Sequence, residues 1–120
     1  MATNLSAVIT LTYNKSGVTF SETVLVDTFD LTGAGVAAGV LSAATSAAAI
    51  PLGGVTTPGG FLLVKNLDAT NYIEIGFDSS GFVAIAKLKA GQAALIPLKN
   101  APWIQANTAA CLCQYRIFDL

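Results

Sequence analysis

The chain has 120 residues, of which 53% are hydrophobic and 11% are charged, and its net charge is −1. A chain of this length buries about two-thirds of its extended surface on folding, so it can form a core without disulfides or metal ions. This composition excludes a disordered chain, and the absence of a basic cluster removes the attraction that dominates nucleic-acid binding. We expect one β domain over residues 1–120, with a weakly charged surface that contacts other proteins.

The first third of the chain predicts a β-hairpin. Residues 5–13 alternate between apolar and polar side chains, as a half-buried strand does, and residues 18–29 show a second alternating run. Residues 14–17, Asn-Lys-Ser-Gly, have the composition of a tight turn between them. The apolar side of the second strand is expected to hold Phe20, Val24 and Val26.

Residues 31–60 are rich in Ala and Gly and carry no charge. A membrane span is not expected, because Pro51, Pro58 and many small residues interrupt the segment. Residues 40–50 could form a helix, but the breakers at 32–35 and 58–60 favour irregular strand and loop. The segment is either an arm or loop, or part of the β domain.

The second half of the chain predicts a series of short strands separated by turns. With the hairpin they make about eight strands at roughly 8–12-residue spacing, which is typical of antiparallel sandwiches, jelly rolls and barrels. We expect an all-β, jelly-roll-like antiparallel β-sandwich, in which the first three strands of this half form a meander. The strands are expected at residues 61–66, 72–77, 82–89, 93–98, 103–106 and 109–118.

Nucleophilic catalysis is not expected, because the chain has no histidine to act as the base. Cys111 and Cys113 lie two residues apart in an alternating strand, which places both on one face but too far apart for an easy disulfide. We interpret them as reduced core residues. Two cysteines without histidine do not make a zinc site. We therefore expect no catalytic, cofactor-binding or metal-binding residues.

Three carboxylates, Asp68, Glu74 and Asp78, fall within one stretch and could in principle form a glycosidase pair. Asp68 and Asp78 lie in predicted turns, where an Asp side chain caps its own backbone. Glu74 alternates with two isoleucines, as a residue on the solvent face of a strand does. The turn at residues 78–81 has too few carboxylates for a calcium loop.

Four aromatic residues could line a sugar-binding platform, although core packing is the more ordinary role for such residues. They are Tyr72, Phe77, Phe82 and Trp103.

The sequence from Val64 to Gly76, VKNLDATNYIEIG, resembles a motif in small virion structural proteins of tailed bacteriophages. Residues 86–98, 104–109 and 115–117 are similar to the later blocks of these proteins in order and spacing. The resemblance covers residues 60–120. It implies an all-β protein without enzymatic activity that decorates the capsid or belongs to the tail.

The resemblance and the low charge together predict a capsid decoration, or cement, protein that binds and stabilises the major capsid shell. The expected partners are copies of the chain itself, as a homotrimer, and the major capsid protein, without nucleic acid, membrane, cofactor or small-molecule substrate. Residues 1–7 do not resemble a signal peptide, so we expect synthesis in the host cytoplasm and a final location in the virion.

Three alternatives remain open. The chain could be a tail or head-to-tail component that uses its sheet edges to form rings or tubes. It could be a sugar-binding module on a fibre or surface appendage. An enzyme that uses carboxylates alone is the third.

Overall fold

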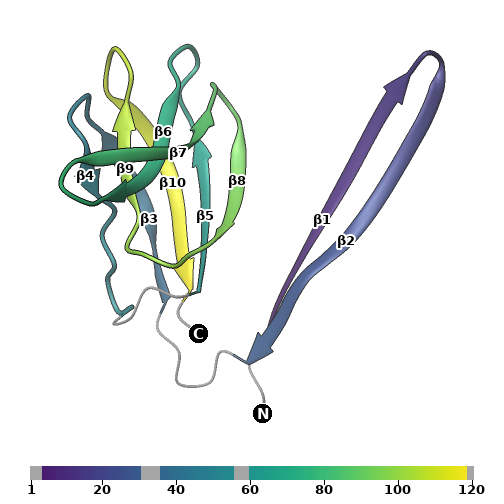
Figure 1. Ribbon diagram of the computed structural model, residues 1–120, viewed down its shortest axis with the longest axis horizontal. Helices are drawn as coiled ribbons and strands as arrows, with labels where there is room; N and C mark the ends of the chain where they lie inside the picture. Colours follow the sequence, from purple (N-terminus) through teal and green to yellow (C-terminus); the bar gives the residue numbers. More distant parts are fainter. Residues whose placement is uncertain (1–3, 31–35, 56–59, 119–120) are drawn as a thin grey trace. The chain divides into compact units, whose positions relative to one another are not determined.

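The computed structural model describes residues 4–30, 36–55 and 60–118 (Figure 1). Over these residues the protein is all-β, with antiparallel sheets and without a helix, which confirms the predicted fold class. No helix long and apolar enough to cross a membrane occurs in this part of the chain. The chain divides into two compact units, residues 1–33 with Leu120 and residues 34–119.

The first unit is a long β-hairpin. Strand β1 (Asn4–Lys15) pairs with strand β2 (Val18–Asp30) in antiparallel register. The two residues between them, Ser16 and Gly17, have φ angles of 54° and 80°. Positive φ at both central residues is the geometry of the two-residue turn that matches the twist of hairpin strands. The predicted hairpin and its turn are confirmed.

A β-bulge interrupts the hairpin near its open end. Ala7 pairs with Asp27 whereas Val8 pairs with Leu25, so Val26 is an extra residue in β2. A bulge breaks strict alternation, so the register does not assign Val26 to the side formed by Phe20 and Val24.

The predicted half-burial of the first strand is confirmed only near its open end, where Ala7 is buried and Leu5 is partly buried. Ile9, Leu11 and Tyr13 are all exposed, with Leu11 at 56%. A ribbon of two strands has no second layer of its own, so an apolar pattern does not by itself bury a face.

The second unit is a β-sandwich of two four-stranded sheets. Sheet I has the strand order β3-β10-β5-β8, and sheet II has the order β4-β9-β6-β7. The strands are β3 (Val36–Ala43), β4 (Ala48–Ala49), β5 (Phe61–Asn66), β6 (Ile73–Asp78), β7 (Phe82–Leu88), β8 (Ala93–Pro97), β9 (Trp103–Ala106) and β10 (Cys111–Phe118).

One hydrophobic core lies between the two sheets, formed by residues at alternate positions of the strands. Sheet I contributes Leu62, Val64 and Ile117, and sheet II contributes Ile73 and Ile75, each no more than 1% exposed. Each fully buried aliphatic side chain of this size stabilises the fold by about 1.5–3 kcal/mol. The sandwich therefore has its own core.

The predicted meander of three strands is wrong in its first pairing. Strand β5 lies between β10 and β8 in sheet I, whereas β6 lies between β9 and β7 in sheet II. Of the three strands of the predicted meander, only β6 and β7 pair with each other as a hairpin. Residues 67–72 therefore cross from one sheet to the other. The Asn66 side chain holds this crossing, since its Nδ2 donates to the Asn71 carbonyl at 2.8 Å and to the Leu88 carbonyl at 3.2 Å.

The Ala/Gly-rich segment supplies an edge strand to each sheet. Strand β3 pairs with β10 at one edge of sheet I, and β4 pairs with β9 at one edge of sheet II. The small residues suit close packing, because a Cβ at Gly39 would lie 3.3 Å from the Tyr115 hydroxyl. The breakers at 32–35 and at 58–59 lie outside the described residues.

Candidate interaction surfaces

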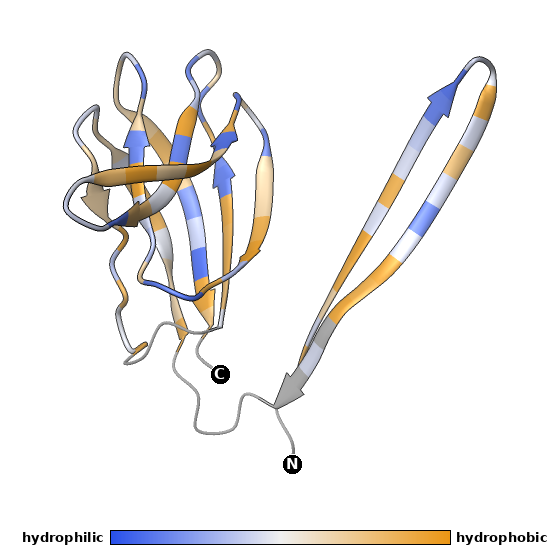
Figure 2. Ribbon diagram, viewed as in Figure 1, coloured by the Kyte–Doolittle hydropathy of each residue, from blue (hydrophilic) through white to orange (hydrophobic). Residues whose placement is uncertain are grey.

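The hairpin exposes a continuous row of apolar side chains on one face. Figure 2 shows hydrophobic and hydrophilic residues alternating along both strands. Tyr13 and Phe20 are cross-strand partners whose rings stack with centroids 5.0 Å apart. We call this surface the ribbon apolar face. It consists of Ile9, Leu11, Tyr13, Val18, Phe20 and Val24, each between 41% and 56% exposed.

Two charged residues share the ribbon apolar face. Glu22 pairs with Leu11 near its middle, and Lys15 pairs with Val18 beside the turn. Glu22 is thus surrounded by apolar neighbours on its own face. An acid in such a position becomes costly when the face is covered, unless the covering surface supplies a cation.

The opposite face of the hairpin is mostly polar. Thr10 and Thr23 approach each other at 3.4 Å, and Asn14 Nδ2 donates to Thr19 Oγ1 at 3.1 Å. Exposed Val8 and Leu25 are exceptions next to the bulge. The hairpin is therefore amphipathic. Isolated two-stranded hairpins are marginally stable in water.

Sheet I presents a second weakly charged surface. We call the outward side of β3, β5, β8 and β10 the sheet I outer face. Its exposed members are Val36, Ala38, Val40, Ser42, Leu63, Lys65, Ala93, Pro97, Leu112, Gln114 and Arg116. Apolar side chains surround two cations, and none of the described residues at these positions is acidic.

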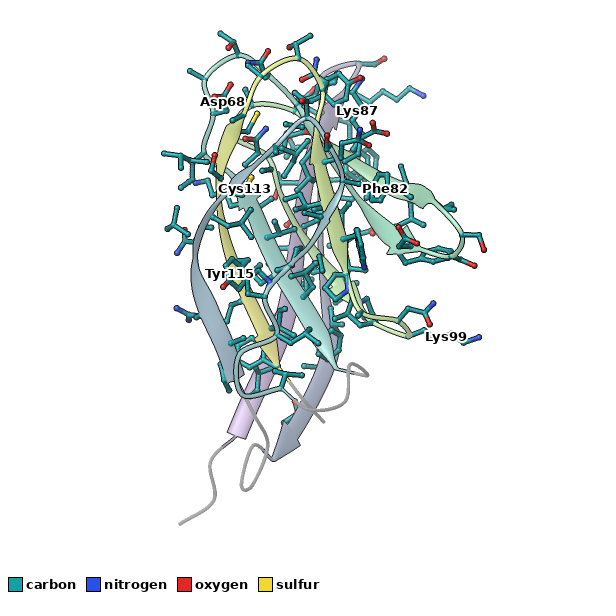
Figure 3. The ribbon with its side chains drawn as sticks, turned by 90° about the vertical axis from the view of Figure 1, so that its left-hand side faces the viewer. Asp68, Phe82, Lys87, Lys99, Cys113 and Tyr115 are labelled. Carbon is teal, nitrogen blue, oxygen red and sulfur yellow. The ribbon has the colours of Figure 1, made fainter. Side chains whose placement is uncertain are left out.

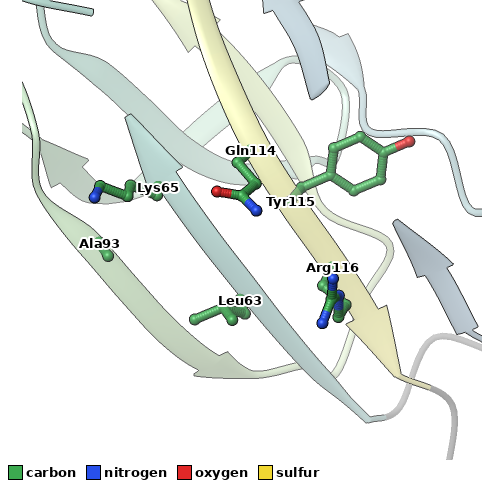
Figure 4. A pocket seen from close by; sticks show the side chains of 6 residues that line it. All are labelled: Leu63, Lys65, Ala93, Gln114, Tyr115 and Arg116. Atoms are coloured by element: carbon green, nitrogen blue, oxygen red, sulfur yellow. The ribbon is translucent and has the colours of Figure 1, made fainter. Parts of the chain in front are cut away.

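A shallow cavity of about 280 Å³ lies on this face (Figure 4). Strand register places Arg116 beside Leu63 and Gln114 beside Lys65. The cavity therefore has an apolar floor with both cations at its border. Its lining residues are Leu63, Lys65, Ala93, Gln114, Tyr115 and Arg116.

A second cavity of about 200 Å³ lies where sheet II meets the strand β8 region, with Phe77, Ile85 and Leu98 in its wall. Lys99 is the charged residue of its lining. A single amine among apolar side chains does not form a catalytic constellation, because nucleophilic and acid–base chemistry need a second positioned group.

Asp68 and Asp78 cap their own turns, as predicted. Asp68 accepts hydrogen bonds from the backbone N–H groups of Asn71 at 2.7 Å and Thr70 at 3.0 Å. These bonds hold the pKa of the Asp68 carboxyl below its usual value of 3.8. Asp78 accepts a hydrogen bond from the Gly81 N–H at 3.3 Å. Both carboxylates are already used by the backbone around them.

Glu74 lies between buried Ile73 and Ile75, so it occupies the solvent side of β6, as predicted. It is four residues from Asp78 along this strand, which corresponds to about 13 Å. Glycosidase carboxylates lie about 5–10 Å apart. Among the described residues, no group of three Asp, Glu, Cys or His side chains is placed to hold a metal ion.

Cys111 and Cys113 are free and fully buried on one side of β10, which confirms their interpretation as reduced core residues. Burial raises the pKa of the Cys113 thiol to about 11, with smaller contributions from Cys111 and Asp68. Burial, and then Asp68, also raises the pKa of Cys111. A protonated, inaccessible thiol is a poor nucleophile. Figure 3 shows Cys113 and Tyr115 along the same strand.

The structure does not gather the four aromatic residues of the sugar-platform hypothesis into one surface. Tyr72 lies at one end of β6, with Lys87 Nζ 4.1 Å from its ring centroid. Phe82 pairs with Asp78 at the other end of β6, about 20 Å away along the strand. Phe77 lines the second cavity, and Trp103 lies opposite Gly76.

Sequence reasoning did not single out Glu22, Lys65 and Arg116, the charged residues within the two apolar surfaces. For Glu22 the signal was present, because it interrupts the apolar series of the second strand between Phe20 and Val24. Alternation in the last strand places Arg116 on the side opposite Cys111 and Cys113, but no local signal joined it to Lys65. They become neighbours only because β5 and β10 pair across a large sequence separation.

Comparison with protein-family models, curated proteins and solved structures found no match for this chain.

Proposed function

We propose that this protein is a non-enzymatic structural subunit of a multi-copy assembly. The observation that carries this proposal is the ribbon apolar face, an exposed surface on a hairpin that forms a compact unit separate from the sandwich core. Exposed apolar surface of this extent is typical of interaction sites. The carboxylates are engaged in turns or dispersed along β6, and the thiols are buried, so the chemistry-bearing groups have structural roles.

More specifically, we propose a bacteriophage capsid decoration protein that binds and stabilises the major capsid shell in the virion as a homotrimer. The resemblance of residues 60–120 to small virion structural proteins supports this role. So does a charged fraction of 11%, since the contact areas of stable assemblies are poor in charge. In the quoted motif, Asn66 and Asp68 shape the crossing between the sheets, so these two residues serve folding.

The alternative role is a tail or head-to-tail component. The observation in its favour is that each sheet of the sandwich ends in edge strands, namely β3 and β8 in sheet I and β4 and β7 in sheet II. Edge strands offer unpaired backbone groups to a neighbouring strand, which is a route to rings and tubes. A decoration protein covers a capsid shell, whereas a tail or head-to-tail component forms rings or tubes.

The test is binding of the purified protein to mature capsids that lack it, measured by co-sedimentation. We expect saturable binding and a higher melting temperature of the decorated shell. Leu11→Asp places a charge on the ribbon apolar face, disturbs the multi-copy assembly that this face supports, and should thereby weaken capsid binding by about tenfold or more. Thr12→Asp places the same charge on the opposite face and serves as the matched control.

Absence of co-sedimentation contradicts the capsid role. Rings or tubes formed by the purified protein, seen by electron microscopy, would favour the tail role instead. If Leu11→Asp and Thr12→Asp bind the capsid equally well, the ribbon apolar face has no part in the assembly that binds the capsid.

A further inference from the structure

We propose that the ribbon apolar face of one copy docks on the sheet I outer face of a second copy of this chain. The inference rests on the proposed assembly role and names its partner surface. It draws on the shape, the apolar content and the charges of the two surfaces.

The two surfaces match in form. Residues 9–15 of β1 extend over about 23 Å, and the eight residues of β10 extend over about 26 Å. Both surfaces are pleated antiparallel sheet faces, which pack on each other at about 10 Å through interdigitating side chains. A two-stranded ribbon thus fits along β10 and β5.

The two surfaces also match in apolar content. Leu11 and Phe20 are exposed on the ribbon, and Val40, Leu63 and Leu112 are exposed on the sheet. The cavity beside Leu63 offers space for an inserted side chain. Docking removes both apolar surfaces from water, at about 25 cal/mol per Å² of apolar area buried.

The charges are complementary. Glu22 lies near the middle of the ribbon apolar face and Lys15 at its turn end, and Lys65 and Arg116 lie within the sheet I outer face, so the complementary charge is that of Glu22. Burying Glu22 against a purely apolar surface would leave an unpaired charge, which is strongly unfavourable. The sheet I outer face supplies the guanidinium and amine that a buried carboxylate needs.

Every copy carries both surfaces, so the partner that we infer is a second copy; docking on the sandwich of the same chain is the competing arrangement, which the crosslinking test separates. The contact joins two different surfaces, so it propagates from copy to copy and closes into a ring when the rotation allows. A closed trimer formed by such contacts leaves no ribbon apolar face uncovered.

The first test compares charge variants by light scattering during size-exclusion chromatography over a range of protein concentrations. Glu22→Arg and Arg116→Glu should each raise the dissociation constant of the oligomer by about tenfold or more. The double variant Glu22→Arg with Arg116→Glu should restore association to within about threefold of the original. Ser21→Arg and Lys99→Glu place the same new side chains elsewhere and should associate like the original protein.

The second test uses cysteine crosslinking between two differently tagged copies. One copy carries Leu11→Cys and the other Leu63→Cys, and a short bismaleimide is added to the mixture. The native thiols are buried and should not react with the reagent, so any crosslinked product should come from the introduced cysteines. We expect a mixed crosslinked dimer. Thr12→Cys on the opposite face replaces Leu11→Cys as the control and should give at least about tenfold less product if the ribbon docks through its apolar face.

Several outcomes overturn the inference. A monomer at every concentration does so, as does an oligomer that the charge variants leave unchanged. A third variant carries Leu11→Cys and Leu63→Cys in the same chain. If it crosslinks within that chain while the two single variants give no mixed dimer, the hairpin folds back on its own sandwich. Self-association without capsid binding would remove the decoration role alone, and capsid binding by a monomer would remove this inference alone.

Discussion

The hairpin and the sandwich use the same sequence pattern with opposite results. Leu11 in β1 and Leu62 in β5 both belong to alternating strands, yet Leu11 is 56% exposed and Leu62 is fully buried. The sandwich has a second sheet to cover its apolar side, and the two-stranded ribbon has none. Alternation therefore identifies which side of a strand is apolar, and the number of layers decides whether that side is buried.

The largest expected difference between the two units is in the cost of removing an aliphatic side chain. Ile75→Ala leaves a cavity in the sandwich core and should lower the free energy of unfolding by about 2–5 kcal/mol. At protein concentrations low enough to keep the chain monomeric, Leu11→Ala should change it by less than about 0.5 kcal/mol, because the side chain is exposed in the single chain. Urea unfolding followed by the fluorescence of Trp103 checks both values. A large loss for Leu11→Ala would mean that the isolated chain already covers the ribbon apolar face.

The next effect concerns the crossing between the sheets. Asn66→Ala removes the amide that bonds to the carbonyls of Asn71 and Leu88 and to the N–H of Asp68 at 2.9 Å. Leaving these buried groups unsatisfied should cost about 1–3 kcal/mol of unfolding free energy. Asn100→Ala, in an exposed turn, is the matched control. Equal stability of the two variants would contradict the role given to Asn66.

A smaller effect is expected from the buried thiols at alkaline pH. Because burial raises the pKa of Cys113 to about 11, the folded state favours the protonated thiol. Its contribution to stability is complete below pH 9 and is lost as the pH rises through about 11. Unfolding titrations from pH 8 to 11 should show a shallower decline for Cys113→Ala than for the original chain. Parallel declines would show that the thiol does not differ between the folded and unfolded states.

The smallest effect is expected from Asp68 at acidic pH. The turn lowers the pKa of this carboxyl below 3.8, so its contribution is present above that pH and is lost as the pH falls through the lowered value. Asp68→Asn should therefore weaken the pH dependence of stability between about pH 4 and pH 2. The side chain is exposed to solvent, which keeps the effect small. If Asp68→Asn leaves the pH dependence of the unfolding free energy unchanged below about pH 4, the backbone hydrogen bonds do not lower the pKa of Asp68.

Local sequence reasoning succeeded where neighbours along the chain decide the structure. The turn at Ser16 and Gly17, the shared face of Cys111 and Cys113 and the capping by Asp68 all follow from spacings of one to three residues. It failed where partners distant in sequence decide. Strand β5 pairs with β10 and β8 instead of β6, because burial against a second sheet outweighs the proximity of consecutive strands.

The sequence by itself determined the all-β class, most strand bounds, the apolar side of each long strand and the absence of histidine-dependent chemistry. Only the tertiary structure decided that the hairpin forms a compact unit of its own, and that Lys65 and Arg116 share one outward face. The physical reason is that side-chain alternation and turn geometry are local properties of the backbone. Layering and strand order depend on which surfaces meet across the chain.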